Sequence, residues 1–154
     1  MKKKIIILDV DGVMTTGKFL YSSKGKLYKE FGAHDSDGLN LLKQNGFQIS
    51  FITSDKKGFK ISKKRISDDL GFKLDLISEK FRLKYLEKKY GLKNIIYFGD
   101  GYHDAKILKK CFFGIAPKNA RYEAKKAANF VTESKSAEGA VLDGALKILK
   151  KFTN

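Results

Sequence analysis

The sequence predicts an α/β fold: a Rossmann-like, doubly wound parallel sheet with a β-hairpin insertion. Two observations lead to this prediction. Short apolar runs typical of buried strands alternate with longer helical patterns, as in parallel sheets whose strands are joined by crossover helices. Three of these runs end in carboxylate or hydroxyl side chains, and the carboxyl ends of parallel strands share one edge of a sheet. A length of 154 residues suits one domain covering residues 1–154.

The first predicted strand is Ile5 to Leu8, four aliphatic residues in a row and therefore typical of a strand buried on both faces. Asp9 ends it and Asp11 follows two residues later, so both carboxylates point the same way in an extended segment. Gly12 allows a sharp turn and a close approach of a ligand. Two neighbouring carboxylates repel each other unless a divalent cation or a shared proton compensates, so the pattern indicates a site. The alternative is a solvated turn.

The next segment, residues 18–31, carries aromatic residues on two arms around Ser22-Ser23-Lys24-Gly25 and predicts a β-hairpin. A lone hairpin is marginally stable in water, so we expect it to pack on its own domain or on another subunit. Asp35-Ser36-Asp37-Gly38 repeats the acidic pattern of the first strand. No apolar strand precedes it and a helical pattern follows, so its acids are expected to cap the N-terminus of that helix.

The remaining elements alternate regularly. The strand at residues 47–52 ends at Thr53-Ser54-Asp55, and the strand at 94–98 ends at Gly99-Asp100-Gly101-Tyr102-His103-Asp104. Further strands are predicted at 74–77, 113–116 and 130–131. Helices are predicted at 58–70 and 80–90, and a short helix follows residue 104. Another helix ends at about residue 127, and the last one begins near residue 139.

The composition indicates which binding partners and which cellular compartment are expected. The formal charge is +15, but arginine occurs only at Arg65, Arg82 and Arg121, and the lysines are scattered along every predicted helix. This distribution favours a solvated lysine surface over a nucleic-acid footprint. Cys111 is the only cysteine, which excludes an intrachain disulfide and favours a reducing, cytoplasmic compartment. The first apolar run is too short for a signal peptide or a membrane span, so no membrane partner is expected.

Four of these elements resemble, in order, the four motifs of the haloacid dehalogenase-like phosphatases. They are Asp9-Val10-Asp11-Gly12, Thr53, Lys80 in Ser78-Glu79-Lys80-Phe81, and Gly99-Asp100-Gly101-Tyr102-His103-Asp104. The resemblance covers essentially the full chain. It implies a phosphomonoesterase in which Asp9 forms an aspartyl-phosphate and Asp11 protonates the leaving group. A carboxylate with an ordinary pKa needs no base to become a nucleophile at neutral pH, which suits this role of Asp9.

The resemblance also implies a Mg²⁺ cofactor, bound by the Asp9 side chain, the Asp11 carbonyl and Asp100. Asp104 would hold metal-bound water or the loop. Oxygen ligands suit Mg²⁺ better than zinc. Thr53 and Lys80 would act in catalysis and contact the phosphate, and the substrate-binding set would comprise Thr53, Ser54, Asp55 and Lys80. His34 and His103 are expected to be solvated or structural, because this chemistry needs neither.

No segment between residues 15 and 47, or between 53 and 80, is long enough for a separate cap domain. With the hairpin and the His34-Asp35-Ser36-Asp37-Gly38-Leu39 stretch, this narrows the resemblance to the capless subgroup of the family. That subgroup acts on acidic sugar phosphates, such as 3-deoxy-D-manno-octulosonate 8-phosphate in lipopolysaccharide biosynthesis and the sialic-acid-type nonulosonate 9-phosphates. In it, hairpins assemble a homotetramer and a neighbouring subunit closes the site.

Two departures from the subgroup leave the substrate open. Ser54-Asp55 stands where octulosonate enzymes carry Gly-Arg, and nonulosonate enzymes more often have an acid there. Residues 135–140 keep only the final Gly-Ala of a segment that usually reads Arg-x-Gly-Gly-x-Gly-Ala, whose arginine reaches a substrate carboxylate. The octulosonate 8-phosphate is the first expectation and a nonulosonate 9-phosphate the alternative. A nucleic-acid 3′-phosphatase and a catalytically idle binding module are further alternatives.

Overall fold

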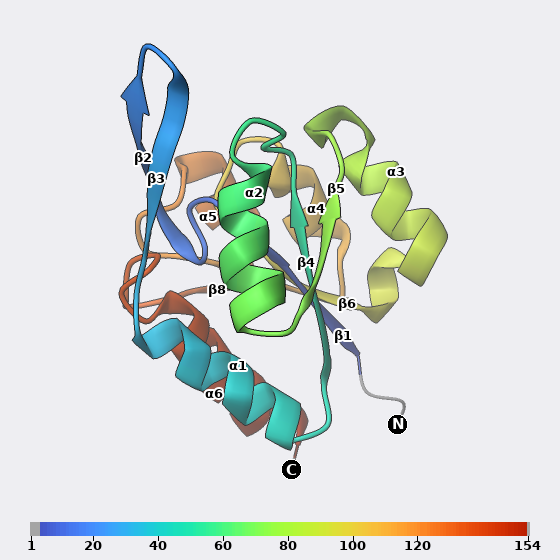
Figure 1. Ribbon diagram of the computed structural model, residues 1–154. Helices are drawn as coiled ribbons and strands as arrows, with labels where there is room; N and C mark the ends of the chain where they lie inside the picture. Colours follow the sequence, from blue (N-terminus) through green and yellow to red (C-terminus); the bar gives the residue numbers. More distant parts are fainter. Residues whose placement is uncertain (1–3, 154) are drawn as a thin grey trace.

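The computed structural model describes residues 4–153, and its centre is a six-stranded, wholly parallel sheet in the order β5-β4-β1-β6-β7-β8 (Figure 1). The predicted doubly wound fold is confirmed. The chain runs outward from β1 to one side and then returns to continue on the other, which places the switch of direction at β1. The strands are β1 (Ile5–Asp9), β4 (Gln48–Thr53), β5 (Lys73–Leu76), β6 (Ile95–Phe98), β7 (Phe113–Ala116) and β8 (Phe130–Val131).

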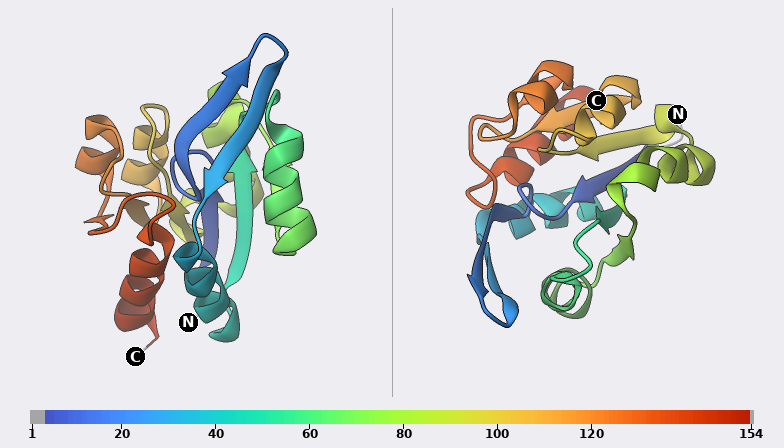
Figure 2. Two further views of the ribbon diagram at one scale, coloured as in Figure 1. Left: turned by 60° about the vertical axis from the view of Figure 1, so that its left-hand side comes forward. Right: turned by 90° about the horizontal axis from the view of Figure 1, so that it is seen from above.

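Helices cover both faces of the sheet (Figure 2). Along β1, Ile6 and Leu8 pack in the cluster on one face, whereas Ile7 packs in the cluster on the other. The strand is therefore buried on both sides, as its unbroken aliphatic run predicts. The first face carries α1 (His34–Gln44), α2 (Phe59–Lys63) and α6 (Ala140–Phe152), and the second carries α3 (Glu79–Tyr90), α4 (Asp104–Lys110) and α5 (Tyr122–Ala127).

The helix predicted over residues 58–70 has two parts. It begins as α2 and continues through Lys64–Asp69 as a wider, π-helical turn, in which the Leu70 N–H donates to the Arg65 carbonyl, five residues back. A 3₁₀ turn at Leu92–Asn94 precedes β6. The other predicted strands and helices are present, with bounds that differ by a few residues. None of the helices in the described residues is long and apolar enough to cross a membrane.

The acids at the start of α1 do not cap that helix, contrary to the prediction. Asp35 is fully buried, and its Oδ1 accepts the backbone N–H of Val141 at 2.9 Å. Val141 lies in the first turn of α6, which packs beside α1 (Figure 1). Asp35 thus satisfies an N–H donor at the N-terminus of a helix more than a hundred residues further along the chain.

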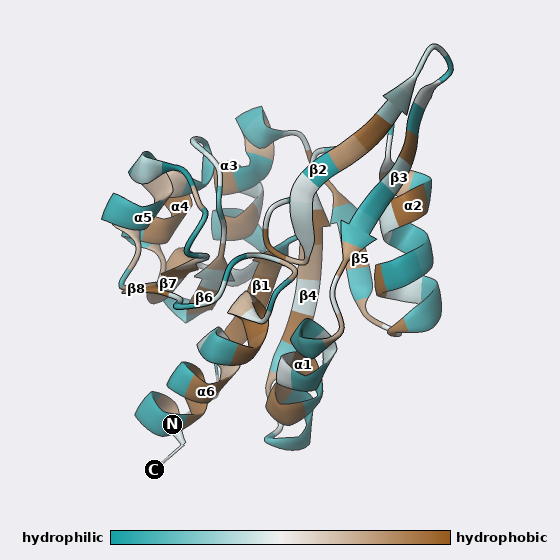
Figure 3. Ribbon diagram, turned by 90° about the vertical axis from the view of Figure 1, so that its left-hand side faces the viewer, coloured by the Kyte–Doolittle hydropathy of each residue, from teal (hydrophilic) through white to brown (hydrophobic). Residues whose placement is uncertain are grey.

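The predicted hairpin, β2 (Thr15–Ser22) paired with β3 (Gly25–Phe31), forms a separate antiparallel ribbon. It projects beyond the carboxyl edge of the main sheet (Figures 1 and 3). Its outer part carries five large apolar side chains that are 45% to 66% exposed: Phe19, Leu20, Tyr21, Leu27 and Tyr28. The hairpin therefore presents an apolar surface to solvent in the single chain.

Candidate active site

A cavity of about 260 Å³ lies at the carboxyl edge of the sheet, where β1 meets β4 and β6. This is the position that open α/β sheets use for ligands. The hairpin contributes Phe19 and Lys26 to the wall, and the exposed His103 pairs there with Glu79 at 3.3 Å. Six residues that were predicted from the sequence as site residues also line the cavity: Asp9, Asp11, Thr53, Ser54, Asp100 and Asp104.

Three of the carboxylates that line this cavity lie close together. Asp9, Asp100 and Asp104 each offer an oxygen atom, and these atoms lie within 4.8 Å of one another. Burial raises the pKa of Asp9 well above its ordinary value, an effect that Arg82 partly offsets. This differs from the ordinary pKa that was expected for Asp9 from the sequence. Burial and then the charge of Asp104 raise the pKa of Asp100 to about 7. Crowded, poorly hydrated carboxylate oxygens are the donor set that a hard divalent cation prefers, so these residues fit Mg²⁺.

Asp104 is already engaged by protein donors. Its Oδ2 accepts the backbone N–H groups of Asp100 and Gly101 at 3.1 and 2.9 Å. Its Oδ1 accepts the Tyr97 hydroxyl at 2.6 Å and Arg82 Nη1 at 3.1 Å. Asp104 therefore holds the loop that presents Asp100, which leaves Asp9 and Asp100 as the carboxylates for a cation.

The chain turns directly after β1, and Asp11 lies in this turn and lines the cavity. Gly12 has φ +79°, and a Cβ at this position would overlap the Asp100 carboxylate. Only glycine combines this conformation with so close an approach. Thr15, which the sequence did not single out, stabilises the turn: its Oγ1 accepts the N–H groups of Gly12 and Gly17 at 3.1 and 3.0 Å and donates to Asp11 Oδ1 at 3.4 Å.

The cation beside Asp9 is Arg82, and the structure does not bring Lys80 to this position. Arg82 is buried, and its Nη1 lies 3.3 Å from Asp9 Oδ2 and 3.1 Å from Asp104 Oδ1. Lys80 is exposed, with its Nζ 5.5 Å from the centre of the Phe81 ring. Residues two apart lie on nearly opposite sides of a helix, whereas Arg82 shares the buried face of α3 with Leu86. An arginine four residues before a core leucine is the sequence signal that could have found it.

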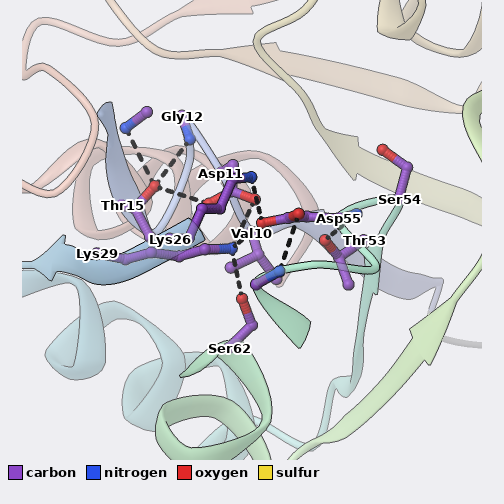
Figure 4. Close-up of polar contacts among 12 residues, drawn as sticks. Val10, Asp11, Gly12, Thr15, Lys26, Lys29, Thr53, Ser54, Asp55 and Ser62 are labelled. Carbon is purple, nitrogen blue, oxygen red and sulfur yellow. Dashed lines mark hydrogen bonds and ion pairs between the residues drawn. The ribbon is translucent and has the colours of Figure 1, made fainter. Parts of the chain in front are cut away.

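Asp55, a predicted substrate contact, lies between two hairpin lysines (Figure 4). Its Oδ2 is 2.7 Å from Lys26 Nζ and 2.8 Å from Lys29 Nζ, and its Oδ1 accepts the Gly58 N–H at 3.1 Å. Partial burial disfavours the charged carboxylate, but the lysines outweigh it and lower the pKa of Asp55 to about 2. Asp55 is not among the residues that line the cavity, whereas Lys26 is. The sequence contains no signal for these pairs, because they depend on where the hairpin docks.

The sequence of the chain is similar to known phosphatases. A family model described as haloacid dehalogenase-like hydrolase matches residues 80–143. The chain is 29% identical to the 3-deoxy-D-manno-octulosonate 8-phosphate phosphatase of Haemophilus influenzae, over 96% of this chain and 83% of that protein. The phosphatase of the same name from Salmonella typhi is 23% identical, over 90% of this chain and 74% of that protein.

Solved structures resemble the chain along nearly its whole length. The 3-deoxy-D-manno-octulosonate 8-phosphate phosphatase from Moraxella catarrhalis, in complex with magnesium ion, phosphate ion and the KDO molecule, superposes with a TM-score of 0.82 and 29% identity, covering 96% of this chain and 86% of that one. The cobalt-bound enzyme from Haemophilus influenzae has a TM-score of 0.82 and 26% identity, covering 96% and 88%. The ions and the sugar belong to those proteins.

Proposed function

We propose, from the premise that this chain is a haloacid dehalogenase-like phosphatase, that it hydrolyses the phosphate ester of a small acidic sugar. The observation that carries the proposal is the convergence of Asp9, Asp11, Thr53 and Asp100 on one cavity at the switch point of the sheet. The relatives make 3-deoxy-D-manno-octulosonate 8-phosphate the first candidate substrate. The second candidate is a nonulosonate 9-phosphate, which the acid at position 55 favours over the Gly-Arg of the octulosonate enzymes.

The reaction we propose has two steps. An oxygen of the Asp9 carboxylate attacks phosphorus, an acyl phosphate forms, and the bond from phosphorus to the sugar oxygen breaks while Asp11 gives that oxygen its proton. Asp11 then takes a proton from water, whose oxygen attacks phosphorus. Inorganic phosphate leaves, and the carboxylate of Asp9 is restored. The lining of the cavity by both Asp9 and Asp11 supports these roles.

Neighbouring groups hold the reacting side chains in position for this reaction. Arg82 fixes one oxygen of Asp9, and the Val10 N–H donates to the other at 2.9 Å. Thr53 Oγ1 accepts the Asp55 N–H at 3.2 Å, so its hydroxyl hydrogen can go to a phosphoryl oxygen. A Mg²⁺ ion held by Asp9, Asp100 and the Asp11 carbonyl would supply the positive charge that a phosphate dianion needs beside these carboxylates.

We expect phosphate release to require Mg²⁺. Removing divalent cations with EDTA should abolish turnover, and added Mg²⁺ should restore it, because the substrate dianion otherwise meets uncompensated carboxylates. Mg²⁺ should also raise the melting temperature of the wild type, since it binds only the folded protein, and raise it less for Asp100→Asn. Activity that is unchanged in EDTA would contradict the assignment of these acids.

The substrate class is tested by measuring phosphate release with Mg²⁺ present across three esters. These are 3-deoxy-D-manno-octulosonate 8-phosphate, N-acetylneuraminate 9-phosphate and a 3′-phosphorylated oligonucleotide. We expect one of the two acidic sugars to have the highest kcat/KM at fixed ionic strength. Ionic strength must be fixed because a net charge of +15 accelerates encounter with every anion. A clear preference for the oligonucleotide would overturn the proposal.

We also propose that the chain forms a homo-oligomer, with a tetramer as the expected size. The exposed apolar side chains of the hairpin support this, because a two-stranded ribbon gains stability when another subunit covers it. Leu20→Asp should reduce the mass measured by light scattering at micromolar concentration. The control is Leu146→Asp on α6, which is similarly exposed outside the hairpin and should leave the mass unchanged. A monomeric wild type would refute the proposal.

A further inference from the structure

The hairpin brings two lysines to Asp55, and their surroundings differ. The Lys29 side chain is 0% exposed. Its Nζ lies 2.9 Å from Asp11 Oδ2, 2.8 Å from Asp55 Oδ2 and 2.9 Å from Ser62 Oγ. A lysine ammonium has three N–H donors, and these three acceptors occupy them all. Lys29 is therefore an internal link between the hairpin, Asp11 and α2, with no donor left for a ligand.

Lys26 lies on the cavity side of the same ion-pair chain. Its side chain is 15% exposed, and its Nζ lies 2.7 Å from Asp55 Oδ2 and 4.1 Å from the centre of the Phe19 ring. Both Lys26 and Phe19 line the cavity that contains Asp9 and Asp11. In the described part of the chain, Asp55 is the only carboxylate within ion-pair distance of Lys26. Asp55 takes one of the three N–H donors of Lys26 and the Phe19 ring faces the same Nζ, so donor capacity remains for a ligand in the cavity.

Lys26 is a basic residue in a cavity whose other charged side chains are mostly acidic. Among the described residues (4–153) that line it, Lys26 is the only lysine or arginine, whereas five are carboxylic acids: Asp9, Asp11, Glu79, Asp100 and Asp104. Asp55 pairs with both Lys26 and Lys29, and Lys29 also pairs with Asp11, so the two lysines already balance the two carboxylates before a second anion reaches Lys26. The cavity thus has an acidic end for a cation and phosphate, and one basic group on the hairpin wall.

We infer that Lys26 binds the carboxylate of the acidic sugar phosphate, that Phe19 packs against the sugar, and that Asp55 is a positioning residue that holds Lys26 in place. This inference rests on the function proposed above. In such a substrate the phosphate and the carboxylate lie at opposite ends of the carbon chain, so the group that recognises the carboxylate must lie away from Asp9. Lys26 is suited to this role because it reaches the cavity from the hairpin, and in the described residues its ion pair is with Asp55, whereas Asp9 pairs with Arg82.

The test compares an ester with a carboxylate and an ester without one. Steady-state kinetics with Mg²⁺ are measured for 3-deoxy-D-manno-octulosonate 8-phosphate, N-acetylneuraminate 9-phosphate and p-nitrophenyl phosphate. The variants are Lys26→Met, which removes the charge but keeps an apolar chain, Lys26→Gln as a second neutral variant, and Lys26→Arg, which keeps the charge. Lys24→Met, at an exposed lysine of the hairpin turn, is the matched control. Circular dichroism checks that each variant is folded.

Losing a hydrogen bond to a charged group should raise KM for the preferred acidic sugar by about tenfold or more, with a smaller change in kcat. The ratio of kcat/KM for the acidic sugar to that for p-nitrophenyl phosphate should fall about as much. Lys26→Arg should restore most of this ratio, and Lys24→Met should keep the wild-type ratio. A role of Lys26 in folding alone would lower both rates together and leave the ratio unchanged.

The outcomes separate this inference from the proposed function. If the wild type prefers an acidic sugar phosphate and the neutral Lys26 variants keep that preference, the assignment of Lys26 is wrong and the proposed function stands. If the wild type hydrolyses p-nitrophenyl phosphate but shows no preference for either acidic sugar, the proposed substrate class fails and the role of Lys26 fails with it. A selective loss in the neutral variants that Lys26→Arg reverses supports both.

Discussion

Replacing Asp9 with asparagine should lower phosphate release by roughly a thousandfold or more, because an amide cannot form the acyl phosphate. The fold should survive. Asparagine has nearly the same shape, and it removes one negative charge from a site where burial, Asp104 and Asp100 already disfavour the ionised form of Asp9. Arg82 is not left without a partner, because it keeps its ion pair with Asp104 at 3.1 Å. Phosphate release and the melting temperature without Mg²⁺ are the two measurements, and the melting temperature should not fall.

The matched control for this prediction is Asp37→Asn. Asp37 belongs to the second Asp-x-Asp-Gly of the chain, is exposed in the first turn of α1, and does not line the cavity. It should therefore keep wild-type turnover. If Asp9→Asn hydrolysed a phosphomonoester at close to the wild-type rate, the mechanism proposed for Asp9 would be wrong.

Replacing Arg82 with methionine should reduce both stability and activity. Arg82 is buried between Asp9 and Asp104, so its loss leaves two carboxylates without their shared cation. Removing one partner of a buried ion pair costs about 3–5 kcal/mol in the free energy of unfolding. Turnover should fall by roughly a hundredfold or more, because Asp9 also loses the group that orients its attacking carboxylate. Urea denaturation and kcat are the measurements.

Lys80→Met is the companion variant for Arg82. Lys80 lies in the same first turn of α3 but is exposed, so stability and turnover should stay near the wild type. Arg82→Lys should recover only part of the loss, because an ammonium lacks the planar fork of a guanidinium. A strong loss of turnover in Lys80→Met, with normal turnover in Arg82→Met, would show that Lys80 is the cation that acts with Asp9, as the sequence motif predicts.

Much of the fold and part of the candidate site could be predicted from the sequence because they depend on local patterns. The aliphatic run from Ile5 to Leu8 predicts a strand buried on both faces, and the structure places it mid-sheet with Ile7 facing one cluster and its neighbours the other. Asp9 is the last residue of the buried strand β1, and Asp100 lies two residues after the buried strand β6. Parallel strands align their carboxyl ends, so local position alone brings such residues to one edge.

The remaining features were decided by the tertiary structure, because they join residues whose approach depends on how whole elements pack. Sequence pattern selects Lys80, yet the rotation of α3 on the sheet buries Arg82 against Asp9 and leaves Lys80 in solvent. Asp55 was expected to contact the sugar, but the docked hairpin places Lys26 and Lys29 against it, and it pairs with both lysines instead. Such pairings follow from the burial of apolar faces, which sets the angle and depth of each element before any charged group finds its partner.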